Sequence, residues 1–221
     1  MPDSCAPLPA SLHAAPAGAG DDRRPSRAEA EAAVRVLIRW AGDRPDREGL
    51  ADTPARVARA YEEWFSGYRT DAEAILGRTF DSGQYDDVVY LRDIPVRSIC
   101  EHHMAAIRGV AHVAYLPGPR VVGISKLARL VEAYARRLQI QERLTVEIAD
   151  TLARVLRPRG VAVVIRATHD CIASRGVGMQ GVAMVTQRVL GHFAQEPHRQ
   201  RMLSFLASGS GNLVAPAASD P

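Results

Sequence analysis

The sequence lacks a hydrophobic run long enough to cross a membrane. Its 221 residues are 47% apolar, but no stretch approaches the roughly eighteen consecutive apolar residues that a spanning helix needs. Residues 1–22 also lack the basic start and the continuous apolar block of a secretory signal peptide. We therefore expect a cytoplasmic protein without a membrane partner, and one large enough to bury a hydrophobic core.

Cysteine is scarce, and its number is odd. The three cysteines are Cys5, Cys100 and Cys171. An odd, small number argues against a disulfide framework and for reduced thiols, as expected inside a cell. Cys5 lies in a segment rich in Pro, Ala and Gly, so Cys100 and Cys171 are the thiols that call for a chemical explanation.

Lysine is almost absent, since Lys126 is the only one and every other basic side chain is arginine. The formal charge of +3 and the pI of about 9.0 permit an anionic ligand. Most arginines alternate with Glu and Asp and form no basic block, which disfavours nucleic acid as a partner. Lys126 suits a site that needs a compact, hydrated charge, although chance would also place one lysine.

The two ends of the chain are predicted to be disordered. Residues 1–26 and 208–221 show no hydrophobic periodicity and are rich in small residues and proline. Between them we expect one domain, 27–207, with a helical N-terminal part over 27–86 and a core over 87–207.

The spacing of apolar residues predicts both helices and strands in this domain. Helices are expected over 27–41, 53–65, 125–137, 140–156 and 197–206, and strands over 87–99, 109–116, 161–167 and 182–189. This order predicts an α+β fold, in which a four-stranded, largely antiparallel sheet carries the two middle helices on one face. Such a small sheet has open edges, which neighbouring subunits could pair.

The most informative stretch is Cys100-Glu101-His102-His103, at the end of the first predicted strand. A second cluster, His169-Asp170-Cys171, follows the third predicted strand. Two thiols and up to three imidazoles could converge on one ion, and zinc takes these ligands in tetrahedral geometry. The ordinary alternatives are a buried cysteine that acts as a small apolar side chain and a histidine that is simply hydrogen-bonded.

The number of metal ligands separates two kinds of site. Cys100, His103 and Cys171 alone would leave one position open for catalysis, whereas a fourth ligand from His102 or His169 would close a structural site. If both histidines stay free, each can carry protons beside an activated water molecule.

An arginine pair, Arg56 and Arg59, lies one turn apart near the start of the helix expected over 53–65. The pair could hold a phosphate group, and an exposed helix face is the alternative explanation.

Five motifs in order resemble the GTP cyclohydrolase I family, and the likeness runs from about Asp52 to Leu206. The motifs are Cys100-Glu101-His102-His103, Gly123-Ile124-Ser125-Lys126-Leu127-Ala128-Arg129, Gln141-Glu142-Arg143-Leu144-Thr145, His169-Asp170-Cys171 and Arg175-Gly176. The resemblance implies the tunnelling fold (T-fold), assembled as a toroidal homodecamer with active sites between subunits. It also implies that GTP and water become 7,8-dihydroneopterin triphosphate and formate, the first step of tetrahydrofolate and pterin biosynthesis.

The resemblance also implies roles for individual residues. Zn²⁺ is held by Cys100, His103 and Cys171, protons are carried by His102 and His169, and Ser125 assists at the ribose. Glu142 binds the guanine edge, with Gln141 beside it and the backbone near Val122 assisting. The triphosphate ligands implied are Ser125, Lys126, Arg129 and Arg175, joined by Arg56 and Arg59 of a neighbouring subunit.

The sequence departs from the usual family pattern around Ala105-Ala106-Ile107, at Gly109-Val110 and over Gly181-Val182-Ala183-Met184, which leaves Thr186 as the main hydroxyl of the last strand. These changes affect the shaping of the pocket and the ring-closing steps. Three alternatives therefore stay open: an enzyme that stops at a ring-opened formamidopyrimidine nucleotide, one that serves a deazapurine pathway, and a non-catalytic, zinc-stabilised nucleotide-binding ring.

Overall fold

The computed structural model describes residues 23–83 and 85–207. Within these residues the chain divides into two compact units between Ala58 and Arg59. The predicted disordered tails lie outside the described residues, apart from 23–26.

The first unit begins with helix α1 (Arg27–Trp40). Ser26 caps this helix by accepting a hydrogen bond from the backbone of Glu29, and the Glu29 carboxylate bonds back to the backbone of Ser26. This capping box fixes the helix start. The 3-10 helix η1 (Glu48–Leu50) follows, and the division falls within helix α2 (Thr53–Trp64). The predicted helices over 27–41 and 53–65 are confirmed.

The second unit holds a mixed α+β core. Its helices are η2 (Ser66–Arg69), α3 (Ala72–Leu76), α4 (Ile124–Ala135), α5 (Gln141–Leu156), α6 (Asp170–Ala173), η3 (His192–Ala194) and α7 (His198–Ala207). Its strands are β1 (Thr79–Asp81), β2 (Val89–Cys100), β3 (Ala106–Leu116), β4 (Arg120–Val122), β5 (Leu138–Gln139), β6 (Gly160–His169) and β7 (Ala183–Gly191).

The four predicted strands correspond to β2, β3, β6 and β7, which pair antiparallel in that order. The prediction of four strands is incomplete, because the main sheet has five strands in the described chain, in the order β5-β2-β3-β6-β7. The two-residue strand β5 pairs parallel with Ile99 and Cys100 only. Strands β1 and β4 form a separate pair. These strands are too short for a period-2 pattern to show in the sequence.

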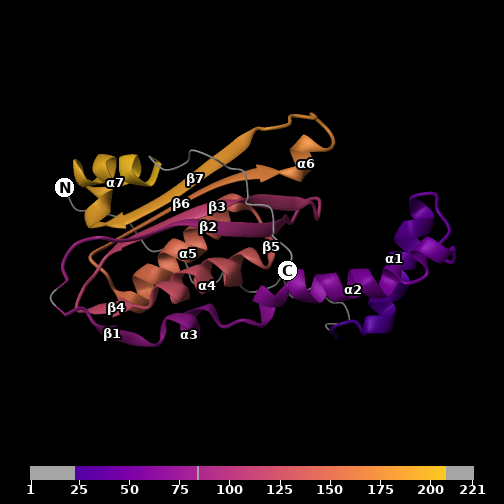
Figure 1. Ribbon diagram of the computed structural model, residues 1–221, viewed down its shortest axis with the longest axis horizontal. Coiled ribbons are helices and arrows are strands. Elements are labelled where there is room, and N and C mark those ends of the chain that lie inside the picture. Colours follow the sequence, from indigo (N-terminus) through magenta and orange to yellow (C-terminus); the bar gives the residue numbers. More distant parts are fainter. Residues whose placement is uncertain (1–22, 84, 208–221) are drawn as a thin grey trace, which may run out of the picture. The chain divides into compact units, whose positions relative to one another are not determined.

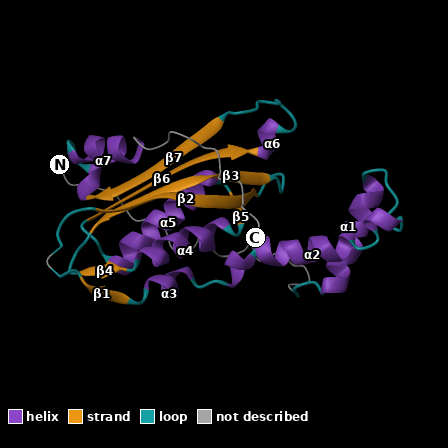
Figure 2. Cartoon of the chain, viewed as in Figure 1, coloured by secondary structure: helices purple, strands orange, loops and turns teal. Residues whose placement is uncertain are grey.

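Helices α4 and α5 cover one face of the main sheet, as the sequence predicts (Figures 1 and 2). Fully buried leucines and isoleucines of these helices pack against the strands, and each such side chain contributes about 1.5–3 kcal/mol by leaving water. On the opposite face, η3 and α7 cover one end of the sheet, where Phe193, Met202 and Leu206 pack on Ala114.

Strand β2 is irregular next to Pro95. The register with β3 shifts between Leu91 and Ile94, and Asp93 has a left-handed backbone with φ 56°. Pro95 itself pairs with Val110 of β3. Proline lacks the N–H that a strand donates to its neighbour, so within sheets it occurs at edges and bulges, and Pro95 lies beside a β-bulge.

None of the helices in the described part of the chain is both long and apolar enough to cross a bilayer.

His112, in β3, is a fully buried titratable side chain. Its Nδ1 accepts a hydrogen bond from the backbone N–H of Asp93, at the bulge, over 3.1 Å. Nδ1 therefore carries no proton, and the neutral ring has its hydrogen on Nε2. Burial lowers the pKa of His112 below 6.5, and the charge of Asp93 opposes this only in part, while Arg92 adds to it.

We expect acid to destabilise the fold through His112. His112 of the unfolded chain binds a proton below about pH 6.5, whereas His112 of the folded chain binds one only at a lower pH. The free energy of unfolding that His112 contributes is therefore fully present above about pH 6.5 and is lost as the pH falls below it. His112→Asn keeps an acceptor near Nδ1 and removes the titration. Its melting temperature should fall less than that of the wild type between about pH 8 and about pH 5.5. An equal fall in both proteins would contradict this role.

Candidate metal centre and active site

The turn between β2 and β3 carries the first histidine and cysteine cluster. The backbone N–H of Cys100 donates to the carbonyl of Ala105, and the N–H of Met104 donates to the carbonyl of Cys100, both over 2.8 Å. Met104 has the left-handed φ of 52° that this tight turn requires. On the other side, the N–H of Glu101 donates to the carbonyl of Gln139 in β5. The turn is therefore held from two directions.

The second cluster lies where β6 passes into α6. Strand β6 ends at His169, which pairs with Ile107 at the start of β3. Arg108 of β3 donates to the carboxylate of Asp170 over 2.7 Å. Because β3 and β6 are antiparallel, the start of one strand adjoins the end of the other, and both clusters lie at the same end of the sheet (Figure 1).

Cys100, His103 and Cys171 form a group that could hold a metal ion. One ligand atom from each residue lies within 4.8 Å of the other two, and both thiols are buried while His103 is exposed. Burial, together with the neighbouring Cys100 thiol, raises the pKa of Cys171. Two adjacent buried thiolates need a compensating cation, so this donor set fits a metal ion that prefers sulfur and imidazole ligands.

His102 lies beside this group. Its Nδ1 is 3.9 Å from the sulfur of Cys100, its Nε2 is 3.9 Å from a carboxylate oxygen of Glu101, and its side chain is 64% exposed. It is therefore accessible to a substrate and is not one of the three converging ligands.

Arg143 forms an ion pair with Glu101, a role that the sequence did not predict. Its two terminal nitrogens donate to the two carboxylate oxygens of Glu101, each over 2.9 Å. The available signal was the position of Arg143 in the first turn of α5, where the helix dipole disfavours a cation. The ion pair ties the cysteine and histidine turn to the start of α5.

His169 is half-buried, and its Nε2 lies 2.9 Å from Oε1 of Gln141. Burial lowers the pKa of His169, and the nearby negative charge of Glu142 opposes this in part. The imidazole is therefore neutral near pH 7 and able to accept a proton. Glu142, on the first turn of α5, has an exposed side chain.

Most of the residues that the family resemblance assigns to the triphosphate lie far from the metal-ligand group of the same chain. Ser125, Lys126 and Arg129 occupy the first turns of α4, a helix about 18 Å long. The far end of α4 leads into β5, which pairs with Cys100. The start of α4 is therefore about one helix length from the metal-ligand group. Val122 ends β4, where its N–H donates to the Tyr115 hydroxyl, and Arg175 is exposed after α6.

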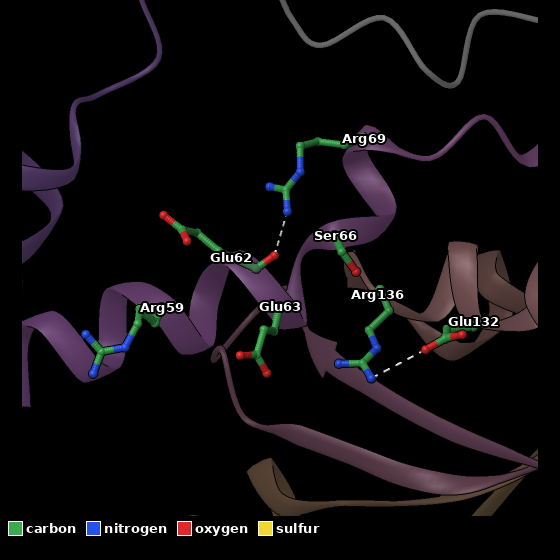
Figure 3. Close-up of a pocket in the computed structure, with 7 residues that line it drawn as sticks. All are labelled: Arg59, Glu62, Glu63, Ser66, Arg69, Glu132 and Arg136. Atoms are coloured by element: carbon green, nitrogen blue, oxygen red, sulfur yellow. Dashed lines mark hydrogen bonds and ion pairs between the residues drawn. The ribbon is translucent and has the colours of Figure 1, made fainter.

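Arg56 and Arg59 are exposed on α2, and Arg56 forms an ion pair with Asp52 over 3.2 Å. Arg59 lines an open groove of about 560 Å³ (Figure 3). The other residues lining it are Glu62, Glu63, Ser66, Arg69, Glu132 and Arg136. Three carboxylates beside three guanidinium groups make this groove a poor triphosphate site by itself.

Comparisons with known proteins point to one family. The family model described as GTP cyclohydrolase I matches residues 30–207. A GTP cyclohydrolase 1 of Maricaulis maris is 55% identical over 184 residues, which cover 83% of this chain and 90% of that protein. A GTP cyclohydrolase 1 of Allorhizobium ampelinum is 54% identical over 185 residues, 83% of this chain and 92% of its own.

A crystal structure of the archaeosine synthase QueF-Like in the apo form matches at 20% identity with a TM-score of 0.40, covering 47% of this chain and 93% of its own. The family model spans every cluster described above, and each of the two relatives matches 83% of the chain. The chain belongs to the GTP cyclohydrolase I family.

Proposed function

We propose that this protein is a zinc-dependent GTP cyclohydrolase I, which converts GTP and water to 7,8-dihydroneopterin triphosphate and formate. The observation that carries the proposal is the convergence of Cys100, His103 and Cys171 while His102 and His169 lie outside that group. Three ligands leave one coordination position for chemistry. Family membership supports the same reaction.

Cys100, His103 and Cys171 would hold the metal, and two thiolates with one imidazole favour zinc among the common divalent ions. Zinc held there would act as a Lewis acid and bring the pKa of a water molecule to about 7. The turn of β2 and β3 and the first turn of α6 supply these ligands from two well-anchored segments.

His102 and His169 would move the protons. Addition of water across the C8–N7 bond of guanine removes one proton from the water and places one on N7, and opening of the C8–N9 bond then leaves a formamide on N7. A second water cleaves the C8–N7 bond and releases formate, and the later ring closure returns one water. His169 is neutral near pH 7 because burial lowers its pKa, so it can take a proton. His102 is exposed beside Cys100, with a carboxylate oxygen of Glu101 3.9 Å from its Nε2.

The remaining residues would bind GTP. The exposed carboxylate of Glu142 can accept hydrogen bonds from N1 and N2 of guanine, with Gln141 beside it in the sequence and the backbone near Val122 assisting. Ser125 would assist at the ribose. The triphosphate ligands would be Ser125, Lys126, Arg129 and Arg175, joined by Arg56 and Arg59 of a neighbouring subunit.

A site shared between subunits would reconcile these positions. The start of α4 is about one helix length from the metal ligands of its own chain, so a neighbouring copy would bring its Lys126 to them. Strand β7 ends the main sheet of the described chain with nine residues, and a second copy could pair with that edge. Both features support a T-fold ring, which we propose to be a toroidal homodecamer.

Product analysis tests the proposed reaction. Zinc-loaded protein is incubated with GTP, formate is measured, and the nucleotide product is oxidised and identified by fluorescence and mass. We expect formate and a pterin triphosphate in equal amounts. A ring-opened formamidopyrimidine without formate would instead support the truncated reaction, and no turnover at any pH would support a non-catalytic nucleotide-binding ring.

Removing either proton carrier should stop turnover but keep the metal. We expect His102→Gln and His169→Gln each to lower kcat by about 100-fold or more, because each removes a general acid or base. Zinc content and melting temperature should stay near those of the wild type. His192→Gln, at an exposed histidine of η3, is the matched control and should retain full activity. Zinc loss in the first two variants would mean that these histidines are ligands.

Mixed oligomers test whether the site is shared. Lys126→Ala and Cys171→Ser should each be inactive alone, because each lacks one half of the site. After the two variants are unfolded and refolded together, about a quarter of the shared sites should combine two intact halves and regain activity. Activity that stays at the level of the separate variants, in oligomers shown by mass to be mixed, would place the whole site within one chain.

A further inference from the structure

The amide of Gln141 is completely committed to partners within the protein. The side chain is 1% exposed, and its nitrogen lies 3.0 Å from the carbonyl of Ile165, 3.1 Å from that of Met184 and 3.1 Å from the Thr186 hydroxyl. Carbonyl oxygens only accept hydrogen bonds, so the group facing them must be the NH₂. Strands β6 and β7 thereby fix which way the amide points.

This orientation determines the hydrogen on His169. Oε1 of Gln141 is left to face Nε2 of His169 at 2.9 Å, and an amide oxygen can only accept. Nε2 must therefore carry a hydrogen. Since a neutral imidazole has one N–H, Nδ1 holds the lone pair.

A pair of threonine hydroxyls continues the same network. Thr145 donates to the backbone carbonyl of Gln141 over 2.8 Å and lies 2.6 Å from the Thr186 hydroxyl. Because the Thr145 proton is used on that carbonyl, Thr186 donates to Thr145, and its oxygen is one of three acceptors that share the two hydrogens of the Gln141 amide. The network links α5 to β6 and β7, and Thr186 belongs to the segment where the sequence departs from the usual family pattern.

We propose that Gln141 is a positioning residue that acts through His169. It holds His169 in the Nε2–H tautomer, so that Nδ1 is the nitrogen that takes and gives the proton during turnover. This replaces a contact between the Gln141 amide and guanine, because both ends of the amide already have buried partners. The catalytic part of the inference rests on the proposed function, whereas the tautomer itself does not.

Neutron diffraction from deuterium-exchanged crystals of the zinc-loaded wild-type protein tests the tautomer directly. At a pH about two units above the 6.5 of free histidine the ring is neutral. We expect deuterium on Nε2 of His169 and the Gln141 ND₂ directed at Ile165 and Met184. Deuterium on Nδ1 with a bare Nε2 would overturn the proposal. This measurement needs neither turnover nor a variant, so it stands even if GTP is not the substrate.

Kinetics separate a positioning role from a guanine contact. We expect Gln141→Leu to lower kcat for GTP by about 100-fold while KM stays within about twofold. A KM that rises with kcat unchanged would show that Gln141 binds the substrate, contrary to the proposal.

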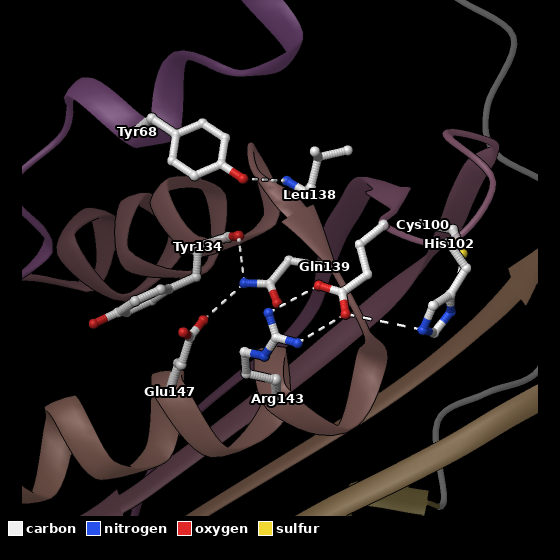
Figure 4. A network of polar contacts seen from close by, with 9 residues as sticks. Tyr68, Cys100, His102, Tyr134, Leu138, Gln139, Arg143 and Glu147 are labelled. Carbon is white, nitrogen blue, oxygen red and sulfur yellow. Dashed lines mark hydrogen bonds and ion pairs between the residues drawn. The ribbon is translucent and has the colours of Figure 1, made fainter. Parts of the chain in front are cut away.

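Gln139→Leu is the matched control for losing a buried amide. Gln139 is also 1% exposed, and its nitrogen donates to the Tyr134 carbonyl and to Glu147 (Figure 4), so neither of these contacts involves His169. Its loss should affect melting temperature without the large fall in kcat. An equal fall in both variants would mean that any buried amide at this end of the core matters, and the positioning role would be rejected.

Discussion

The antiparallel pairing of β3 with β6 is the constraint on which the site depends. It runs without interruption from Leu116 opposite Gly160 to Ile107 opposite His169. At that last pair, the turn before β3 and the helix after β6 come together, and two thiols far apart in sequence become neighbours. A slip of one residue would turn every side chain of one strand to the other face and separate the thiols. The geometry of the metal-ligand group therefore depends on the same strand register that stabilises the sheet.

The start of α5 supports both histidines that lie beside this group. Gln141, its first residue, meets His169, and Arg143, two residues later, holds the Glu101 carboxylate that faces His102. One helix terminus therefore orients two imidazoles on two different segments. Glu142 lies between Gln141 and Arg143 in the sequence. Its side chain is exposed and therefore available to a ligand. The three consecutive residues Gln141, Glu142 and Arg143 therefore have different partners: His169, solvent and Glu101.

Much of the fold could be predicted because the long strands and helices have clear apolar periodicity. The cysteine and histidine clusters could also be predicted, since both thiols lie near a histidine at a strand end. Strand β5 could not be predicted, because a strand of two residues shows no alternation of apolar and polar side chains. It nevertheless pairs with Cys100 and accepts a hydrogen bond from Glu101. Arg143 and the Gln141 amide were missed as structural supports, because their partners come from segments distant in sequence. The roles assigned by resemblance to the phosphate-type residues remain proposals, which depend on a neighbouring copy.

The central claim is that the metal is held by three protein ligands and keeps one position open. X-ray absorption at the zinc edge of the loaded protein tests it most directly. We expect two sulfur atoms at about 2.3 Å and two lighter atoms at about 2.0 Å, with the outer-shell signal of a single imidazole. The signal of two imidazoles would show that His102 or His169 completes the shell. The site would then be closed and structural, in contradiction to the catalytic role proposed for it.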